Sequence, residues 1–268
     1  MPIPLATLFG SPRPLIGMVH LAPLPGSPRW GGSLDVVLER AVTDARALEA
    51  AGLDGLVVEN YCDVPFYPES VPAETVAAMA VCVREVVKAV SLPVGVNLLR
   101  NDGPGAVAIA AVTGARFVRI NLHTGMMATD QGFLSGRAYE TTRLRQRLGA
   151  EVAIFADVWV KHATPFPGAE LEQAAEDAFH RGLADALIVT GSGTGKTTDL
   201  ARVERVKLSV SAAPVFIGSG FTSENAAHAL SIADGAIVGS SICRGGVAGA
   251  GIDPELATAL VRVVRAGR

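Results

Sequence analysis

Residues 15–58 read LIGMVHLAPLPGSPRWGGSLDVVLERAVTDARALEAAGLDGLVV: a short apolar run, a polar loop, an amphipathic segment and a second apolar run. In the amphipathic segment apolar side chains recur at helical spacing, and Gly52 follows as a residue that ends helices. Two apolar runs joined in this way are typical of parallel strands, because parallel neighbours need a long crossover connection. This stretch therefore predicts one β–α–β unit.

The same pattern repeats along the chain. Parallel strands that helices bury on both faces are expected to close into a barrel when eight of them follow one another. The length of 268 residues is close to the roughly 250 residues of such a barrel. We therefore expect an α/β fold, a single (β/α)8 TIM barrel over residues 1–268. Its eight strands are expected at 15–19, 55–58, 94–96, 117–120, 152–156, 186–189, 215–217 and 236–238.

Composition and charge exclude several classes of function. The formal net charge of -3 provides no basic surface for nucleic acid or anionic lipid. No apolar stretch approaches the roughly 18 residues that a membrane span requires, and no basic region followed by a long apolar core opens the chain. We expect a cytoplasmic protein with no nucleic acid polymer as partner, no membrane insertion, no metal and no cofactor. Homo-oligomerisation is left open.

Polar side chains follow six of the apolar runs at the point where each strand should end. Side chains alternate along a strand, so a polar residue two places after an inward apolar one also faces the barrel axis. Catalysis in such barrels takes place at the carboxyl ends of the strands. The sequence thus predicts a small-molecule site there. The six strand-end residues are His20, Glu59, Asn97, Asn121, Asp157 and Thr190.

The residue types at these positions indicate acid–base catalysis. Asp157 and Glu59 are expected to act as acid and base, and His20 to move a proton near neutral pH. Arg119 lies one layer deeper, where an ion pair with a carboxylate is favoured over ligand binding. Substrate-binding groups are expected at the other strand ends and in the loop after Asp157: Asn97, Asn121, Lys161, His162 and Thr190.

Small residues cluster after the seventh and eighth strands, where barrels of this type build phosphate sites from backbone amides. We expect a phosphate at these two turns. The segment 190–197 resembles a P-loop but has Thr190 where that motif needs glycine, so we exclude a nucleotide triphosphatase. The expected phosphate-binding residues are Gly218, Ser219, Gly220, Gly239, Ser240 and Ser241.

Several of these segments together resemble the BtpA family. The resemblance includes HLAPLPG at 20–26, VEN at 58–60, RIN at 119–121 and DVWVKH at 157–162, and it covers almost the whole chain. It implies a barrel of the phosphate-binding type. The family takes its name from a cyanobacterial factor needed for photosystem I biogenesis, and other members have been labelled as similar to phosphoribosylanthranilate isomerase. The resemblance does not name a reaction.

Three functions are compatible with these observations. The first is an enzyme that binds a small phosphorylated metabolite, a sugar phosphate or ribose-phosphate derivative, and catalyses isomerase-type or lyase-type proton transfer. The alternative is a non-catalytic assembly or stability factor of the photosystem I biogenesis type. The third is a hydrolase, either cleaving an N-glycoside with the carboxylates of Glu59 and Asp157 or using a metal held by His123 or His162.

Overall fold

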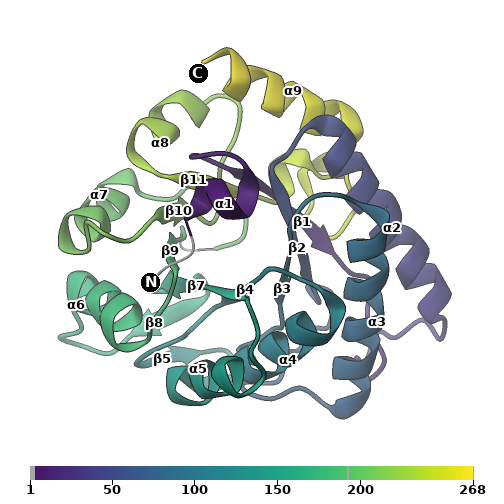
Figure 1. The fold of residues 1–268 in the computed structure, drawn as a ribbon, viewed down its shortest axis with the longest axis horizontal. Coiled ribbons are helices and arrows are strands. Elements are labelled where there is room, and N and C mark those ends of the chain that lie inside the picture. Colours follow the sequence, from purple (N-terminus) through teal and green to yellow (C-terminus); the bar gives the residue numbers. More distant parts are fainter. Residues whose placement is uncertain (1–3, 192, 268) are drawn as a thin grey trace.

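The computed structural model describes residues 4–191 and 193–267 and shows a closed barrel of eight parallel strands (Figure 1). Each of the eight expected runs forms a strand, so the predicted TIM barrel is confirmed. Around the barrel the order follows the chain, and the last strand pairs with the first. The strands are β1 (Leu15–His20), β2 (Gly55–Glu59), β3 (Val94–Asn97), β4 (Phe117–Ile120), β7 (Ala153–Val158), β9 (Ala186–Val189), β10 (Val215–Ile217) and β11 (Gly235–Val238).

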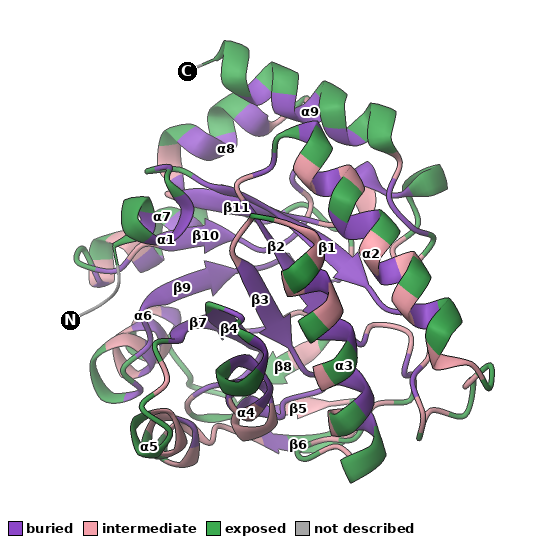
Figure 2. Cartoon of the chain, turned by 45° about the vertical axis from the view of Figure 1, so that its right-hand side comes forward, coloured by how far each residue is buried: buried purple, intermediate pink, exposed green. Residues whose placement is uncertain are grey.

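Helices between the strands cover the outside of the barrel, and Figure 2 shows the strands buried beneath them. Gly52, with a φ of 87°, ends the first of them as expected. No helix in the described part of the chain is both long and apolar enough to span a bilayer. The helices are α2 (Leu34–Ala51), α3 (Ala73–Ala89), α4 (Gly103–Thr113), α5 (Ala138–Arg147), α6 (Leu171–Glu176) with the π-helical turn η1 (Asp177–Arg181), α7 (Leu200–Ser209), α8 (Ala226–Ile232) and α9 (Pro254–Ala266).

Aromatic rings fill the amino-terminal half of the barrel. Phe155 lies with its ring centroid 5.0 Å from that of Phe117 and 5.1 Å from that of Phe216. A short helix that the sequence pattern did not predict, α1 (Leu5–Phe9), closes this end, and its Phe9 ring lies 5.4 Å from Phe117. Such a floor excludes water, so any ligand has to enter from the opposite end.

Two of the long loops at the carboxyl end pair with each other, which the sequence pattern also did not predict. The loop after β4 forms a hairpin of β5 (Met126–Thr129) and β6 (Gly132–Ser135), and the loop after β7 adds β8 (Ala163–Pro165). These strands are only three or four residues long, too short for a clear alternation in the sequence. The pairing holds the β7 loop, which carries Lys161 and His162, across the barrel mouth.

The aromatic floor depends on glycines in neighbouring strands. A Cβ atom added at Gly95 would lie 2.4 Å from the ring of Phe117, which is completely buried and cannot move aside. We expect Gly95→Ala to lower the free energy of unfolding by about 1–3 kcal/mol through overpacking. Urea unfolding measures this, with Gly31→Ala as the control because a Cβ there meets nothing within 4 Å. Equal losses in both variants would contradict this packing.

Candidate active site at the carboxyl ends of the strands

His20 and Glu59 face each other at the ends of β1 and β2. The two residues are in register across these strands, and His20 Nε2 lies 3.8 Å from Glu59 Oε1. Both side chains are buried, and both line a cavity at the barrel mouth. No described residue donates a hydrogen bond to the Glu59 carboxylate. Glu59 is therefore a buried carboxylate with acceptor capacity left for a ligand.

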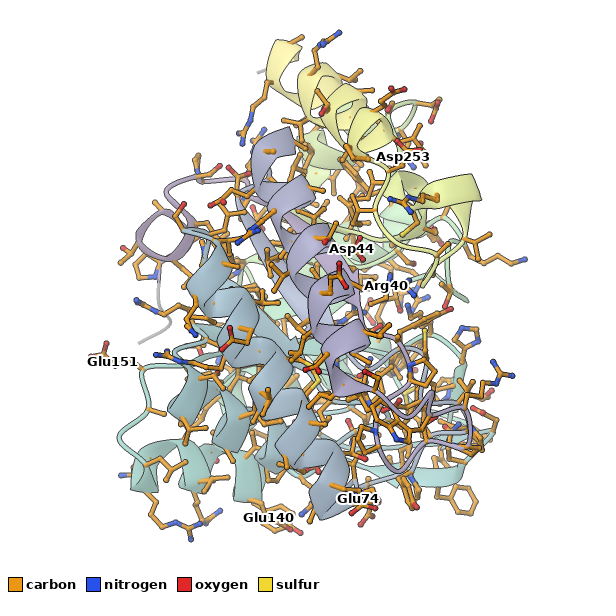
Figure 3. All side chains as sticks on the ribbon, turned by 90° about the vertical axis from the view of Figure 1, so that its right-hand side faces the viewer. Arg40, Asp44, Glu74, Glu140, Glu151 and Asp253 are labelled. Carbon is orange, nitrogen blue, oxygen red and sulfur yellow. The ribbon has the colours of Figure 1, made fainter. Side chains whose placement is uncertain are left out.

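The loop after β11 determines which ring nitrogen of His20 carries the proton. The Gly249 amide lies 3.4 Å from His20 Nδ1 and donates to it, so the proton of the neutral ring is on Nε2, facing Glu59. The same loop is fixed on α2, where Arg40 donates to the Gly249 carbonyl and Asp44 accepts from the Ile252 amide at 2.9 Å. Figure 3 shows Arg40 and Asp44 side by side on this helix.

Burial, followed by the positive charge of Lys161, lowers the pKa of His20 to about 3. The ring is consequently neutral near pH 7, when it can donate one hydrogen bond from Nε2. The sequence predicts that His20 moves a proton near neutral pH. A pKa lowered in this way favours the neutral ring, which acts as a hydrogen-bond donor.

Arg119 and Asp157 form a two-point ion pair inside the barrel. Arg119 Nε donates to Asp157 Oδ1 and Nη2 donates to Oδ2, both at 3.0 Å, and both side chains are almost fully buried. The carboxylate partner that the sequence predicts for Arg119 is thus Asp157. Glu59 forms no ion pair with Arg119. Because both Asp157 oxygens are engaged, the environment of this carboxylate differs from that of Glu59.

Three of the predicted substrate-binding residues do not line the mouth cavities. Asn97 donates to Asn121 Oδ1 at 2.9 Å, and Asn121 in turn lies 3.5 Å from Asp157 Oδ2. Thr190 is fully buried, and its methyl group would lie 2.7 Å from a Cβ added at Gly218. The two asparagines are thus linked to the ion pair, and none of the three residues lines either cavity at the mouth.

The two small-residue turns after β10 and β11 come together at a small cavity that His20, Glu59, Arg119 and Lys161 also line. The backbone amides of four residues in these turns donate to no acceptor in residues 4–191 and 193–267. Unpaired amides beside a cationic guanidinium are suited to an anion. The four residues are Ser219, Gly220, Ser240 and Ser241.

Other groups of the predicted phosphate site are already engaged. The Gly218 amide donates to the Val189 carbonyl at 2.8 Å and continues the strand pairing. The Ser219 hydroxyl accepts a hydrogen bond from the Gly191 amide and donates one to the backbone carbonyl of Lys196. The Ser241 hydroxyl donates to the Phe221 carbonyl at 2.7 Å. These contacts fix the shape of the turns. The four unpaired backbone amides therefore remain as the hydrogen-bond donors for an anion.

A larger cavity of about 680 Å³ opens beside the small one. Glu59, Lys161, Thr194 and Ala248 line both, so the two cavities are adjacent. Lys161 is partly buried and makes no hydrogen bond through its ammonium group to a described residue. Burial and the nearby charge of Arg119 lower the pKa of Lys161. His162 lies at the rim, where its ring accepts from the Thr194 amide at 3.2 Å.

The sequence reasoning missed several residues of this larger cavity. Tyr61, Phe66 and Leu99 form an apolar wall, and Arg100 is buried in it with only 4% of its surface exposed. All four follow β2 or β3 in the loops. The one signal in the sequence is that a charged residue, Arg100, directly follows Leu98 and Leu99 after the end of β3.

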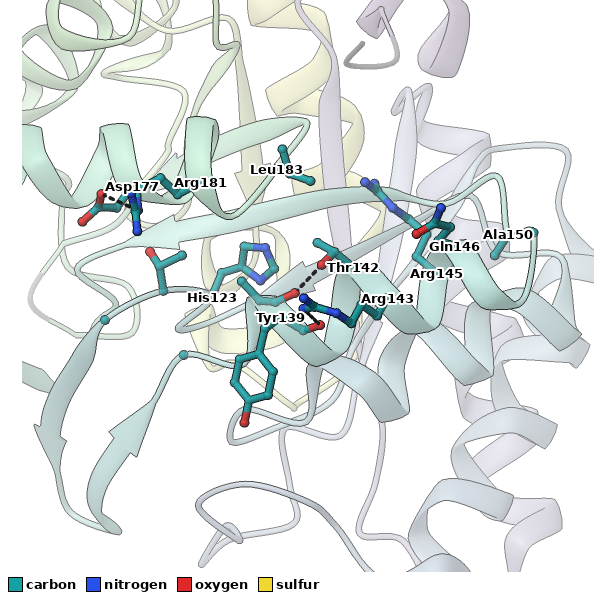
Figure 4. Close-up of a pocket in the computed structure, with 15 residues that line it drawn as sticks. His123, Tyr139, Thr142, Arg143, Arg145, Gln146, Ala150, Asp177, Arg181 and Leu183 are labelled. Atoms are coloured by element: carbon teal, nitrogen blue, oxygen red, sulfur yellow. Dashed lines mark hydrogen bonds and ion pairs between the residues drawn. The ribbon is translucent and has the colours of Figure 1, made fainter.

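Apart from the two mouth cavities, a wider hollow of about 980 Å³ lies on the side of the barrel between α5 and η1 (Figure 4). Of the residues that the sequence analysis named, only His123, the possible metal ligand, lines it. His123 is buried there, with Nε2 2.8 Å from the Gly182 carbonyl. In the described residues no three His, Cys, Asp or Glu side chains converge as a metal site would require. The mouth cavities therefore remain the candidate active site.

A closed parallel barrel with this polar mouth belongs to the TIM-barrel class, whose active sites lie at that end. One solved structure of this fold is N-(5'-phosphoribosyl)anthranilate isomerase from Pyrococcus furiosus, with a TM-score of 0.57 and 14% identity over 95% of this chain and 99% of that one. At that identity the similarity shows the fold alone.

The family is shown by closer relatives. The BtpA family model matches residues 11–266. The photosystem I biogenesis protein BtpA of Synechocystis is 45% identical over 97% of this chain and 90% of its own length. An uncharacterized protein of Thermococcus kodakarensis is also 45% identical, over 94% of this chain and 95% of its own. The chain therefore belongs to the BtpA family.

Removing the partner of Arg119 leaves a buried charge uncompensated. We expect Asp157→Ala to lower the free energy of unfolding by about 3–5 kcal/mol. Urea unfolding measures the loss. Glu172→Ala is the control, because it breaks a two-point pair with Arg205 that is exposed to solvent, and we expect a much smaller change. Similar losses in the two variants would argue against the buried pair as described.

Two buried histidines make stability depend on pH. The pKa of His20 is lowered to about 3 and that of His123 to about 4, chiefly by burial. Below an ordinary histidine pKa of about 6.5, the unfolded chain takes up protons that the folded chain does not. Stability should fall as pH decreases from 6.5 toward 4, with each histidine adding up to about 1.4 kcal/mol per pH unit.

The slope can be measured by urea unfolding at several pH values. We expect His20→Gln to make the dependence shallower than in the wild type. His228→Gln controls for the loss of an exposed histidine. An unchanged slope in His20→Gln would show that His20 protonates equally in the folded and unfolded chains.

Proposed function

We propose that this protein is an enzyme that binds a small phosphorylated metabolite at the barrel mouth and catalyses proton transfer on it. One observation supports this most directly: a cavity lined by Glu59, whose carboxylate accepts no hydrogen bond from the described residues, also contains the two turns whose amides have no acceptor among those residues. A sugar phosphate or a ribose-phosphate derivative is the expected substrate class. An isomerase or a lyase would use the same parts.

In the proposed complex, the phosphate accepts hydrogen bonds from the amides of Ser219, Gly220, Ser240 and Ser241. Arg119 lines the same cavity, and because it uses only Nε and Nη2 for Asp157, its Nη1 group remains as a further N–H donor. Backbone amides hold phosphate without a rotamer cost, since the strands already fix them. The phosphate end of the substrate is thus held by the turns that follow β10 and β11.

Glu59 is the proposed base. The amides of Ser219, Gly220, Ser240 and Ser241 are called the amide cradle. The Glu59 carboxylate lies where the cavity with this cradle meets the larger cavity, and there it can remove a proton from a carbon atom beside a carbonyl group. The electron pair left on carbon moves to the carbonyl oxygen, where a hydrogen-bond donor stabilises it. His20 Nε2 and the Lys161 ammonium line the cavity and are the candidate donors. The acidic form of Glu59 then returns the proton to the product.

For Asp157 we propose a positioning role in place of the acid–base role expected from the sequence. Its two oxygens hold the Arg119 guanidinium, and its side chain lines neither mouth cavity. An N-glycoside hydrolase would need two carboxylates on either side of the scissile bond. Because Asp157 is turned to Arg119, the expected pair of Glu59 and Asp157 is not available for that chemistry, and this form of the third function is disfavoured. Asp130 is the other acidic residue that lines the larger cavity.

The competing function is assembly. The name of the Synechocystis relative supports a role in photosystem I biogenesis for that protein. An assembly factor needs a surface for its partner protein and does not need Glu59 or unpaired amides in a cavity. The two functions therefore differ in how they respond to substitutions inside the mouth.

Phosphate binding can be tested by placing a negative charge in the cradle. We expect phosphorylated sugars to raise the melting temperature of the wild type, because ligand binding to the folded state stabilises it. Ser240→Asp should abolish the shift, whereas the similarly sized, neutral Ser240→Asn should keep most of it. A shift that survives in Ser240→Asp would place the ligand elsewhere.

Proton transfer has its own measurement. A bound substrate should exchange a carbon-attached proton with D2O, detectable by NMR, and Glu59→Gln should slow that exchange at least about 100-fold while binding persists. Absence of exchange for every compound that binds at the cradle would favour the assembly function instead.

A further inference from the structure

Arg100 is a buried cation that has no ion-pair partner among the residues that the structure describes. Its side chain lines the larger cavity with 4% of its surface exposed, and no carboxylate oxygen of the described residues lies within 4.0 Å of it. Nη2 donates to the Lys161 carbonyl at 2.6 Å, which uses one of five N–H donors. A buried guanidinium without a carboxylate is costly unless an anion compensates it.

Lys161 adds a second unpaired cation to the same cavity. No described carboxylate lies within 4.0 Å of its ammonium nitrogen either. Arg29 lines the rim, and the two acidic residues of the cavity are Glu59 and Asp130. Burial lowers the pKa of Arg100 as it does that of Lys161, and the more distant carboxylates of Glu59 and Asp157 oppose this effect in both residues.

The proposed base, Glu59, borders both of the proposed anion-binding regions. The amide cradle belongs to the small cavity and Arg100 to the large one, and Glu59 and Lys161 line both. A molecule that occupies the cradle and reaches Arg100 would pass Glu59 on the way. The large cavity, about 680 Å³, exceeds what a phosphate group alone would occupy.

We infer that the substrate of this site is doubly anionic, with a phosphate on the amide cradle and a second anionic group, a carboxylate or a second phosphate, on Arg100. This inference rests on the proposed function and narrows its substrate class. The guanidinium matches either group by forming two parallel hydrogen bonds. The reacting carbon then lies between the two anchors, beside Glu59.

Matched pairs of ligands test the second anchor. Glucose 6-phosphate and 6-phosphogluconate differ by a carboxylate, and fructose 6-phosphate and fructose 1,6-bisphosphate differ by a second phosphate. Calorimetric titration of the wild type should give at least about tenfold tighter binding of the doubly anionic member of one pair. The pair with the larger gain identifies which anionic group Arg100 takes.

Variants of Arg100 test whether this residue causes the tighter binding of the doubly anionic ligand. Arg100→Met should reduce the difference within the pair to less than about threefold and leave the affinity for the monophosphate unchanged. Arg100→Lys keeps the charge and should restore part of the gain, which a purely structural role of Arg100 would not predict. Arg143→Met, an exposed arginine on α5, is the control. Melting curves without ligand establish that each variant is folded.

The outcomes separate this inference from the proposed function. Equal binding within both pairs, or a gain that survives in Arg100→Met, overturns the second anchor while phosphate binding stands. Failure of all four compounds to bind, with no effect of Ser240→Asp on any thermal shift, overturns the phosphate site and with it the inference.

Discussion

A guanidinium lies inside this barrel between an aromatic floor and a polar mouth, and Asp157 is the group that compensates its charge. The pair is formed through two hydrogen bonds of 3.0 Å from Arg119. Asn121 approaches the same carboxylate, and Asn97 hydrogen-bonds to Asn121. A buried charge of this kind requires its partner and its hydrogen bonds together. The pair therefore orients the polar layer on which the cavity rests.

The same eight strands serve two purposes along their length. Their amino-terminal halves supply Phe117, Phe155 and Phe216, which with Phe9 of α1 form a closed apolar floor. Their carboxyl ends supply polar side chains and amide-bearing turns. Since the floor is dry, charges at the mouth interact in a low dielectric, which strengthens their effect on a bound anion.

Membership of the BtpA family and the similarity to TIM-barrel enzymes do not by themselves establish a reaction, because one fold supports many functions. What distinguishes this chain is a set of groups with unused bonding capacity in the described structure. They are the Glu59 carboxylate and the amides of Ser219, Gly220, Ser240 and Ser241, which make no hydrogen bond, and the cations Arg100 and Lys161, which have no carboxylate within 4.0 Å. Groups left unsatisfied in a cavity are available to a ligand. They support the enzyme more than the assembly factor.

The sequence by itself determined the barrel and the inward direction of the strand-end residues. Alternation along a strand is local, so His20 and Glu59 could be placed on the inner face from the printed letters alone. The sequence did not determine which inward residues reach the ligand. Asp157 is engaged by Arg119, and Asn97 and Asn121 are linked to that pair by hydrogen bonds. Thr190 is fully buried, while Arg100 enters the cavity from a loop.

Those distinctions depend on contacts between strands and loops that are far apart in the chain, such as β5 with β8 and Gly249 with His20. Only the tertiary structure brings these groups together, because the depth and partners of a side chain depend on register and packing, and local sequence spacing does not specify either.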